Sequence, residues 1–115
     1  MKLKSELYKD EQIKLSNKII DILELDENNQ IILYNLDNDE NKINKIIGLT
    51  PELRKYFSFR DISGLEKTET KKRPYLSIIR QITKLTHEMD YKDKQLTING
   101  NKIRSRVYTF NKYKN

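Results

Sequence analysis

The chain has 115 residues and a formal net charge of +6 at neutral pH, with 36% hydrophobic and 35% charged residues. A chain of this length forms one domain with its own core, and the recurring Ile, Leu and Tyr residues exclude a disordered composition. The lack of cysteine excludes disulfides, thiolate metal sites and a cysteine nucleophile. Neither a signal peptide nor a membrane span is recognisable, so we expect one intracellular domain over residues 1–115 with no membrane partner.

The first half of the chain predicts three helices and one strand. Apolar residues at helical spacing indicate the first helix, Asp37 and Asn38 are suitable caps for the second, and a Thr-Pro-Glu start indicates the third. These helices are expected over residues 5–24, 39–47 and 50–57. Between the first two lies QIILYNL (residues 30–36), an apolar and β-branched run that predicts a buried strand.

The second half predicts a loop, a long helix and a hairpin. Residues 58–70 hold few periodic apolar residues and are expected to be a loop. Pro74 opens a helix expected to reach residue 89. Its buried stripe is expected to be Tyr75, Ile79, Ile82, Thr86 and Met89. Two β-rich runs, 95–98 and 102–110, flank an Asn-Gly-Asn sequence, which is a strong hairpin signal.

This order of elements predicts an α+β fold, mainly helical, of the winged helix-turn-helix kind. In such a domain the helix before the hairpin enters the major groove and the hairpin wing contacts the backbone. The candidate recognition helix is residues 74–89, and the candidate wing is the hairpin of residues 95–110. The sequence leaves open whether this hairpin is a free wing or part of a larger sheet shared with residues 30–36.

The charge is unevenly distributed along the chain. Residues 1–49 hold seven Lys and ten acidic residues, a net of −3, whereas residues 50–115 hold sixteen Lys or Arg and seven acidic residues, a net of +9. Such asymmetry within one domain indicates an electropositive face, whose commonest targets are polyanions. Every arginine follows residue 53, and arginine is well suited to phosphate contacts. A basic surface that only maintains solubility is the plainer alternative.

Polar and basic side chains are expected on the open side of the candidate recognition helix. By their spacing of three and four residues they share one stripe, and they can read base edges or hold phosphates. They are Ser77, Arg80, Gln81 and Lys84. Lys71, Lys72 and Arg73 precede the helix N-terminus, where the helix dipole also attracts anions. The alternative is an ordinary polar face on an amphipathic helix.

Three cations alternate with uncharged residues in the last strand. We call Lys102, Arg104 and Arg106 the hairpin cations. Period-two geometry puts them on one face and the intervening Ile103, Ser105 and Val107 on the other. Three neighbouring like charges repel one another unless an anion lies across them, so the pattern predicts phosphate contacts. A solvated wing with incidental charge is the alternative.

Signals for catalysis are few. His87 is the lone histidine, and one histidine without a second at helical spacing makes a poor metal site. It is expected at the surface or as a cation at a helix end. The sequence contains no Gly-rich phosphate loop and no nucleophile motif. We therefore expect a protein that is not an enzyme, without catalytic residues, metal, cofactor or small-molecule substrate.

One stretch resembles a known group of proteins. Residues 49–110 contain LTPELRKYFSF, then KKRPYLSIIRQITK, then NGNKIRSRVYTF. They resemble short winged-helix-like proteins of large nucleocytoplasmic DNA viruses of the mimivirus kind, in which an Arg-Pro-aromatic-Leu-Ser helix precedes a basic β-hairpin. The resemblance implies a DNA-associated or factory-associated protein, with Arg73, Arg80 and the hairpin cations as contacts. Host cytoplasm, nucleus and viral factory are all compatible with it.

The leading interpretation is a nucleic-acid-binding protein that holds duplex DNA, in preference to RNA, mainly through phosphates. Two alternatives stay open. In the first, the acidic N-terminal helix of one copy meets the basic half of another, which gives a homodimer or a larger scaffold. In the second, Tyr91, Tyr108 and Tyr113 stack on the bases of single-stranded DNA or RNA.

Overall fold

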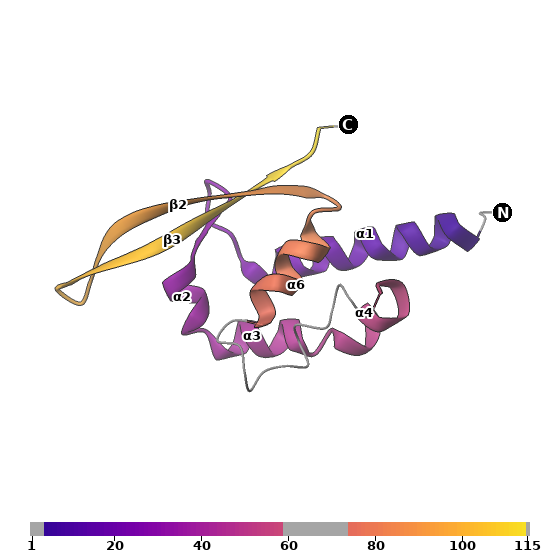
Figure 1. Cartoon of the computed structure of the whole chain (residues 1–115), viewed down its shortest axis with the longest axis horizontal. Coiled ribbons are helices and arrows are strands. Elements are labelled where there is room, and N and C mark those ends of the chain that lie inside the picture. The colour runs from indigo at the N-terminus through magenta and orange to yellow at the C-terminus, as the bar shows by residue number, and fades with distance from the viewer. Residues whose placement is uncertain (1–3, 59–73, 115) are drawn as a thin grey trace.

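The computed structural model describes residues 4–58 and 74–114, which form an α+β fold with a three-stranded antiparallel sheet (Figure 1). The helices are α1 (Lys4–Leu23), α2 (Leu33–Asp37), α3 (Glu40–Ile47), α4 (Thr50–Tyr56) and α6 (Pro74–Thr83). The strands are β1 (Gln30–Ile32), β2 (His87–Ile98) and β3 (Asn101–Lys112). None of the helices in these residues is long and apolar enough to cross a membrane.

The core lies between the sheet and the helices, which all cover the same side of the sheet (Figure 1). Helix α1 contributes Leu15, Ile19 and Leu23, as the helical spacing predicted. Helix α6 contributes Tyr75, Ile78, Ile79 and Ile82 to the core and contacts both α1 and α3. Tyr108 and Phe110 of β3 cover this helical layer and are 1% and 2% exposed.

The predicted helices of the first half are confirmed, with one change of cap. The helices expected over residues 5–24, 39–47 and 50–57 are α1, α3 and α4. The cap of α3 is Asp39, whose carboxylate accepts a hydrogen bond from the Lys42 N–H. Asp37 instead ends α2 and accepts a hydrogen bond from the Tyr75 hydroxyl, so it joins α2 to α6.

The predicted strand over residues 30–36 is wrong in its second half. The strand β1 stops at Ile32, and the chain turns at once into the five-residue helix α2. Leu33 and Leu36 are both buried, and residues three apart share a face of a helix but not of a strand. The Tyr34 N–H donates to Ser105 Oγ, 3.0 Å away, instead of extending the ladder with β3.

The predicted helix over residues 74–89 is wrong beyond Thr83. The Thr83 hydroxyl donates to the Ile79 carbonyl at 2.5 Å, and the N–H groups of Leu85 and Thr86 bond three residues back, as in a closing turn. The strand β2 begins at His87. Thr86 is therefore buried in a turn, and Met89 pairs with Phe110 in the sheet.

The hairpin is confirmed and is longer than expected, because β2 and β3 pair over twelve residues each. Its turn is Asn99-Gly100 alone, since Ile98 pairs with Asn101. Asn99 and Gly100 have φ values of 51° and 81°, as a two-residue type I′ turn requires. The strand order is β1-β3-β2, so the base of the hairpin belongs to a larger sheet. Its tip reaches beyond the helices as a two-stranded ribbon (Figure 1).

The two faces of this ribbon carry different residues. We call the face that continues into the core the helix-side face, and the other the open face. From the cross-strand pairs, the helix-side face holds Met89, Tyr91, Asp93, Gln95, Thr97, Lys102, Arg104, Arg106, Tyr108 and Phe110. The open face holds Glu88, Asp90, Lys92, Lys94, Leu96, Ile103, Ser105, Val107 and Thr109.

Candidate nucleic-acid interface

The stripe predicted on the candidate recognition helix is present on α6 and in the turn that follows it. Ser77, Arg80 and Lys84 are exposed, while Tyr75, Ile78 and Ile82 on the opposite side are buried. Gln81 is half-buried and accepts a hydrogen bond from Lys84 Nζ at 3.0 Å. Lys84 lies just beyond the end of α6, in the turn that leads to β2. The three cations expected ahead of this helix, Lys71, Lys72 and Arg73, lie outside the described residues.

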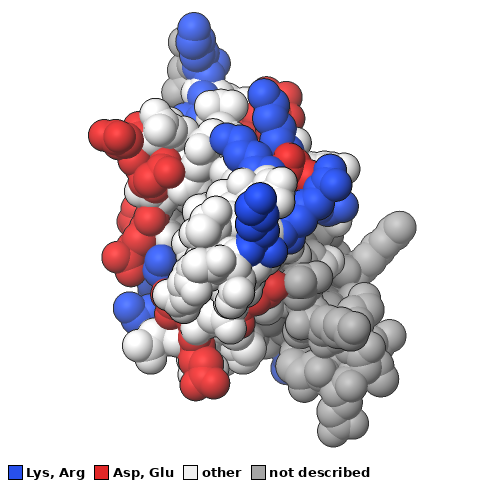
Figure 2. Space-filling model, turned by 90° about the vertical axis from the view of Figure 1, so that its left-hand side faces the viewer, with Lys and Arg blue, Asp and Glu red and all other residues white. Residues whose placement is uncertain are grey.

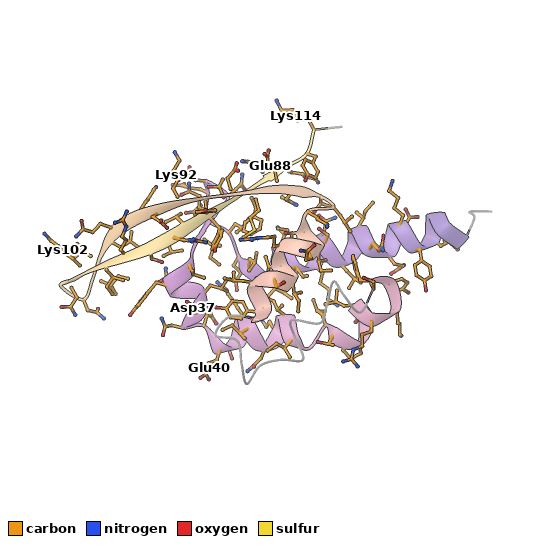
Figure 3. All side chains as sticks on the ribbon, viewed as in Figure 1. Asp37, Glu40, Glu88, Lys92, Lys102 and Lys114 are labelled. Carbon is orange, nitrogen blue, oxygen red and sulfur yellow. The ribbon has the colours of Figure 1, made fainter. Side chains whose placement is uncertain are left out.

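The hairpin cations share one face of β3, as the alternation predicted. This face is the helix-side face, because Tyr108 and Phe110, two and four residues after Arg106, lie on the same face of β3 and enter the core. The structure thus places Arg104 and Arg106 where the sheet begins to leave the helices. Lys102 stands at the tip of the hairpin, beyond the helices (Figure 3). The hairpin cations therefore do not lie on the open face, which points away from the helices.

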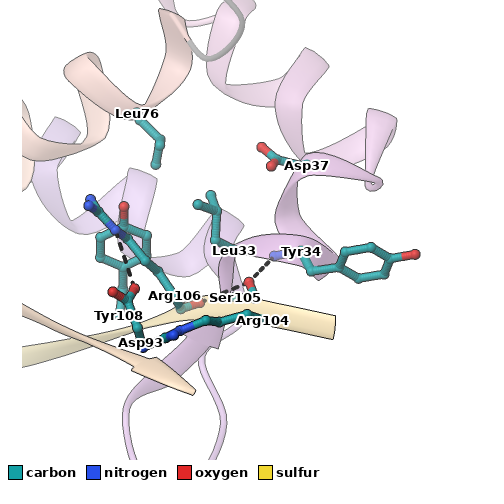
Figure 4. A pocket seen from close by; sticks show the side chains of 9 residues that line it. All are labelled: Leu33, Tyr34, Asp37, Leu76, Asp93, Arg104, Ser105, Arg106 and Tyr108. Atoms are coloured by element: carbon teal, nitrogen blue, oxygen red, sulfur yellow. Dashed lines mark hydrogen bonds and ion pairs between the residues drawn. The ribbon is translucent and has the colours of Figure 1, made fainter. Parts of the chain in front are cut away.

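A hollow lies between the hairpin, α2 and the start of α6 (Figure 4). Its volume is about 510 Å³. It is lined by Leu33, Tyr34, Asp37, Leu76, Asp93, Arg104, Ser105, Arg106 and Tyr108. The ring of Tyr34 points away from the two arginines in Figure 4. The hollow therefore has an apolar floor, two guanidinium groups and two carboxylates, and its charge is balanced.

Arg106 is held in place by its neighbours. Its Nε lies 3.6 Å from Asp93 Oδ1, and its guanidinium lies over the Tyr91 ring, 4.3 Å from the centroid. A hydrogen bond with Tyr108 raises the pKa of Arg106 above its ordinary value. The side chains of Arg106 and Asp93 are 43% and 47% exposed, so this ion pair contributes little stability. Arg106 is a fixed cation at the rim of the hollow.

Lys102 and Arg104 are differently placed. Within residues 4–58 and 74–114, neither side chain has an ion-pair or hydrogen-bond partner, and both are exposed. They border a second hollow together with Asp93 and Gln95. These two cations are therefore available to an external anion in a way that Arg106 is not.

The hairpin and α6 meet at the first hollow. Leu76 of α6 lines it together with Arg104 and Arg106. Arg80 follows Leu76 by four residues, about one helical turn, so it lies on the same side of α6. The exposed Arg80 therefore lies one turn along α6 from the half-buried Leu76, which borders the hollow with the hairpin arginines.

The surface seen from the hairpin tip is shown in Figure 2. Basic side chains predominate in its upper part, with some acidic side chains among them, and acidic side chains predominate along its left side and lower end, with some basic ones. An electropositive area of this kind attracts polyanions at a distance.

Several residues of this region were not predicted from the sequence. Asp93 and Asp37 place carboxylates beside the arginines, and Leu33 supplies the apolar floor. Asp93 could have been found, because the hairpin turn alone fixes its pairing with Arg106. The position of Asp37 depends on α2, which the sequence did not reveal.

His87 is buried, which corrects the expectation of a surface residue or a cation at a helix end. Its Nδ1 lies 2.6 Å from Thr86 Oγ1, which in turn lies 2.6 Å from Ser16 Oγ. Burial, and secondarily the charge of Lys112, lower the pKa of His87. Among the described residues, no group of three or more His, Cys, Asp or Glu side chains is arranged to hold a metal.

Comparison with known proteins gives no relative. No protein-family model, no curated protein and no solved structure matches the chain.

Proposed function

We propose that the chain is a nucleic-acid-binding protein, without catalytic activity, that holds duplex DNA mainly through its phosphates. The observation that carries the proposal is the pair Lys102 and Arg104. They lie on one face of the protruding hairpin without partners among the described residues, and Arg106 follows them on the same face of β3. Exposed cations spaced along an extended strand suit the regular spacing of backbone phosphates.

The arrangement we infer is of the winged helix-turn-helix kind. The order of elements supports it, because a helix-rich first part is followed by α6 and then by the β2–β3 hairpin. In this arrangement the exposed side of α6, with Ser77, Arg80 and Gln81, faces the major groove. Lys102 and Arg104 then contact the neighbouring backbone. The helix α6 has ten residues, about 15 Å, which is enough to present two turns to a groove.

The test is fluorescence anisotropy with labelled duplex DNA, single-stranded DNA and RNA of equal length, each at two salt concentrations. We expect the duplex to bind most tightly, with an affinity that falls steeply with salt. Lys102→Ala/Arg104→Ala is expected to weaken binding about tenfold and to lower the salt slope by about 2. Lys45→Ala, an exposed lysine on α3, is the control and is expected to change neither.

Each result has a definite meaning. Tighter binding of a single strand or RNA would replace duplex DNA as the ligand and would bring Tyr91, which is 52% exposed, into the site. Equal affinity of the double variant and the wild type would remove the hairpin from the interface. Absence of binding to all three nucleic acids at low salt would refute the proposal and would assign the basic surface to a protein partner.

A further inference from the structure

The strand β2 forms one edge of the sheet. It is paired with β3 on one side only, and residues 90–95 are all exposed. Within the part of the chain that the structure describes, no backbone hydrogen bond joins the other side of β2 to another segment. An unpaired edge of this length can accept a further strand.

The backbone groups on this edge can be assigned from the hairpin register. Ile98 and Asn101 flank a two-residue turn and so form a hydrogen-bonded pair. Every second residue of β2 back from Ile98 then bonds to β3, which leaves the N–H and C=O groups of Met89, Tyr91, Asp93 and Gln95 directed outward. The bond from the Phe110 N–H to the Asn29 carbonyl, on the opposite side of β3, agrees with this assignment.

The open face of β2 carries two acidic residues followed by two basic residues. Glu88, Asp90, Lys92 and Lys94 are all exposed, and none has an ion-pair partner among the described residues. Glu88 and Lys92 both project away from the helices (Figure 3). When a second copy of this strand runs in the opposite direction beside it, the order Glu-Asp-Lys-Lys meets Lys-Lys-Asp-Glu, so every charge faces an opposite charge. The middle of this pattern is Tyr91.

Two copies of β2 paired antiparallel about Tyr91 would satisfy these charges. Asp90 lies opposite the partner's Lys92, and Glu88 lies opposite the partner's Lys94, so the two-fold axis generates four opposite-charge pairs. These residues occupy the non-hydrogen-bonded positions, where the Cα atoms are about 4.5 Å apart and side chains are closest. Tyr91 occupies a hydrogen-bonded position opposite itself, as the outward direction of its N–H and C=O groups requires.

The neighbouring registers do not share this property. With the axis at Asp90 or at Lys92, that residue would oppose its own copy in the partner. One step further, with the axis at Asp93, Lys92 would oppose the partner's Lys94, and with the axis at Met89, Glu88 would oppose the partner's Asp90. Like charges directly opposite each other are destabilising in a sheet. Only the register about Tyr91 both aligns the outward backbone groups and pairs opposite charges over the exposed part of β2.

We propose that the protein forms a symmetric homodimer by antiparallel pairing of β2 with the β2 strand of a second copy about Tyr91. The two sheets join into one of six strands. Its outer edges are the two β1 strands, which have three residues each, and residues 101–106 of β3, which β1 does not cover. That part of β3 carries the hairpin cations, and like charges disfavour pairing with a further copy, so the assembly closes as a dimer. This dimer differs from a head-to-tail contact between acidic and basic halves, and it requires no nucleic acid.

Sedimentation equilibrium of the full chain at low salt, without nucleic acid, tests the proposal. Lys92→Glu places a carboxylate opposite the partner's Asp90 at two symmetric positions and is expected to weaken the dimer about tenfold. Asp90→Lys/Lys92→Glu exchanges the charges within each pair and is expected to restore the wild-type dissociation constant. Lys45→Glu makes the same change of net charge on α3 and is the control.

A second pair of variants tests the backbone hydrogen bonds between the two β2 strands. Asp93→Pro removes an N–H that points outward, so it leaves the β2–β3 ladder intact, whereas it removes two hydrogen bonds from the dimer. Asp93→Ala loses the same side chain and keeps the N–H. We expect the proline variant to be monomeric and the alanine variant to dimerise, with equal circular dichroism spectra.

A wild-type protein that stays monomeric up to about 0.5 mM would overturn the proposal. The proposal would also be overturned if Asp90→Lys/Lys92→Glu dimerised no more tightly than Lys92→Glu, or if the proline and alanine variants dimerised equally. Because nucleic acid is absent from these measurements, a protein that does not dimerise leaves the DNA-binding proposal standing. A protein that binds no nucleic acid likewise leaves the dimer proposal standing.

Discussion

Thr86→Val is expected to destabilise the protein by removing one hydroxyl at the junction of α1, α6 and β2. The Thr86 hydroxyl lies 2.6 Å from both Ser16 Oγ and His87 Nδ1. All three residues are buried, with Ser16 0%, Thr86 9% and His87 8% exposed. Valine has nearly the shape of threonine, so the substitution removes the hydrogen bonds and leaves the packing unchanged.

The size of the effect depends on how the former partners are satisfied. A buried polar group that loses its partner costs about 1–3 kcal/mol. The Ser16 hydroxyl can turn to a carbonyl of the preceding turn of α1, so most of the cost falls on His87. We therefore expect the free energy of unfolding to fall by about 2 kcal/mol. For a chain of 115 residues this corresponds to about 8 °C in Tm.

Urea and thermal unfolding followed by circular dichroism would measure this change. Thr97→Val, at an exposed position of β2, makes the same chemical change and is expected to alter stability by less than about 0.5 kcal/mol. Ser16→Ala/Thr86→Val should cost less than the sum of the single variants, because they share one interaction. A Thr86→Val protein as stable as the control would refute the network as a source of stability.

Two further predictions concern His87 and Gly100. Because burial lowers the pKa of His87, the unfolded state binds a proton below about pH 6.5 that the folded state does not bind. Tm should therefore fall as the pH is lowered from about 7.5 to about 5.5, and His87→Gln should make this dependence of Tm on pH less steep. The same pH dependence in the variant and the wild type would contradict this prediction. Gly100 has a φ of 81°, and a methyl group added to its Cα would meet no other atom within 4 Å, so Gly100→Ala should cost about 1 kcal/mol through backbone strain alone. A urea midpoint unchanged from the wild type would exclude that strain.

Much of the fold could be predicted because its signals are local. The spacing of Leu15, Ile19 and Leu23 marks α1, and Asn99-Gly100 marks the hairpin turn, without reference to distant residues. The end of α6 was missed because Thr86 and Met89 continue its helical spacing. The strand β2 is almost wholly exposed between Asp90 and Gln95, so it has no apolar alternation to reveal it.

Part of the candidate site could also be predicted from a local pattern. Alternation in β3 places the hairpin cations on one face, since this property depends only on the strand period. Which face they share is decided by Tyr108 and Phe110, which have the same parity and enter the core. The hollow beside them depends on α2 and α6, which meet the hairpin only in the folded chain, so no local pattern could indicate it.

The central position of β3 also bears on how the protein is synthesised. Both β1 and β2 bond to β3 and not to each other, and β1 pairs with residues 107–109, far along the chain. During translation the first helices can form early, but no strand has its partner until residues 101–112 have left the ribosome tunnel. The sheet therefore forms late and in one step, and ribosome-bound chains that stop before β3 should show helical but not sheet protection in hydrogen exchange.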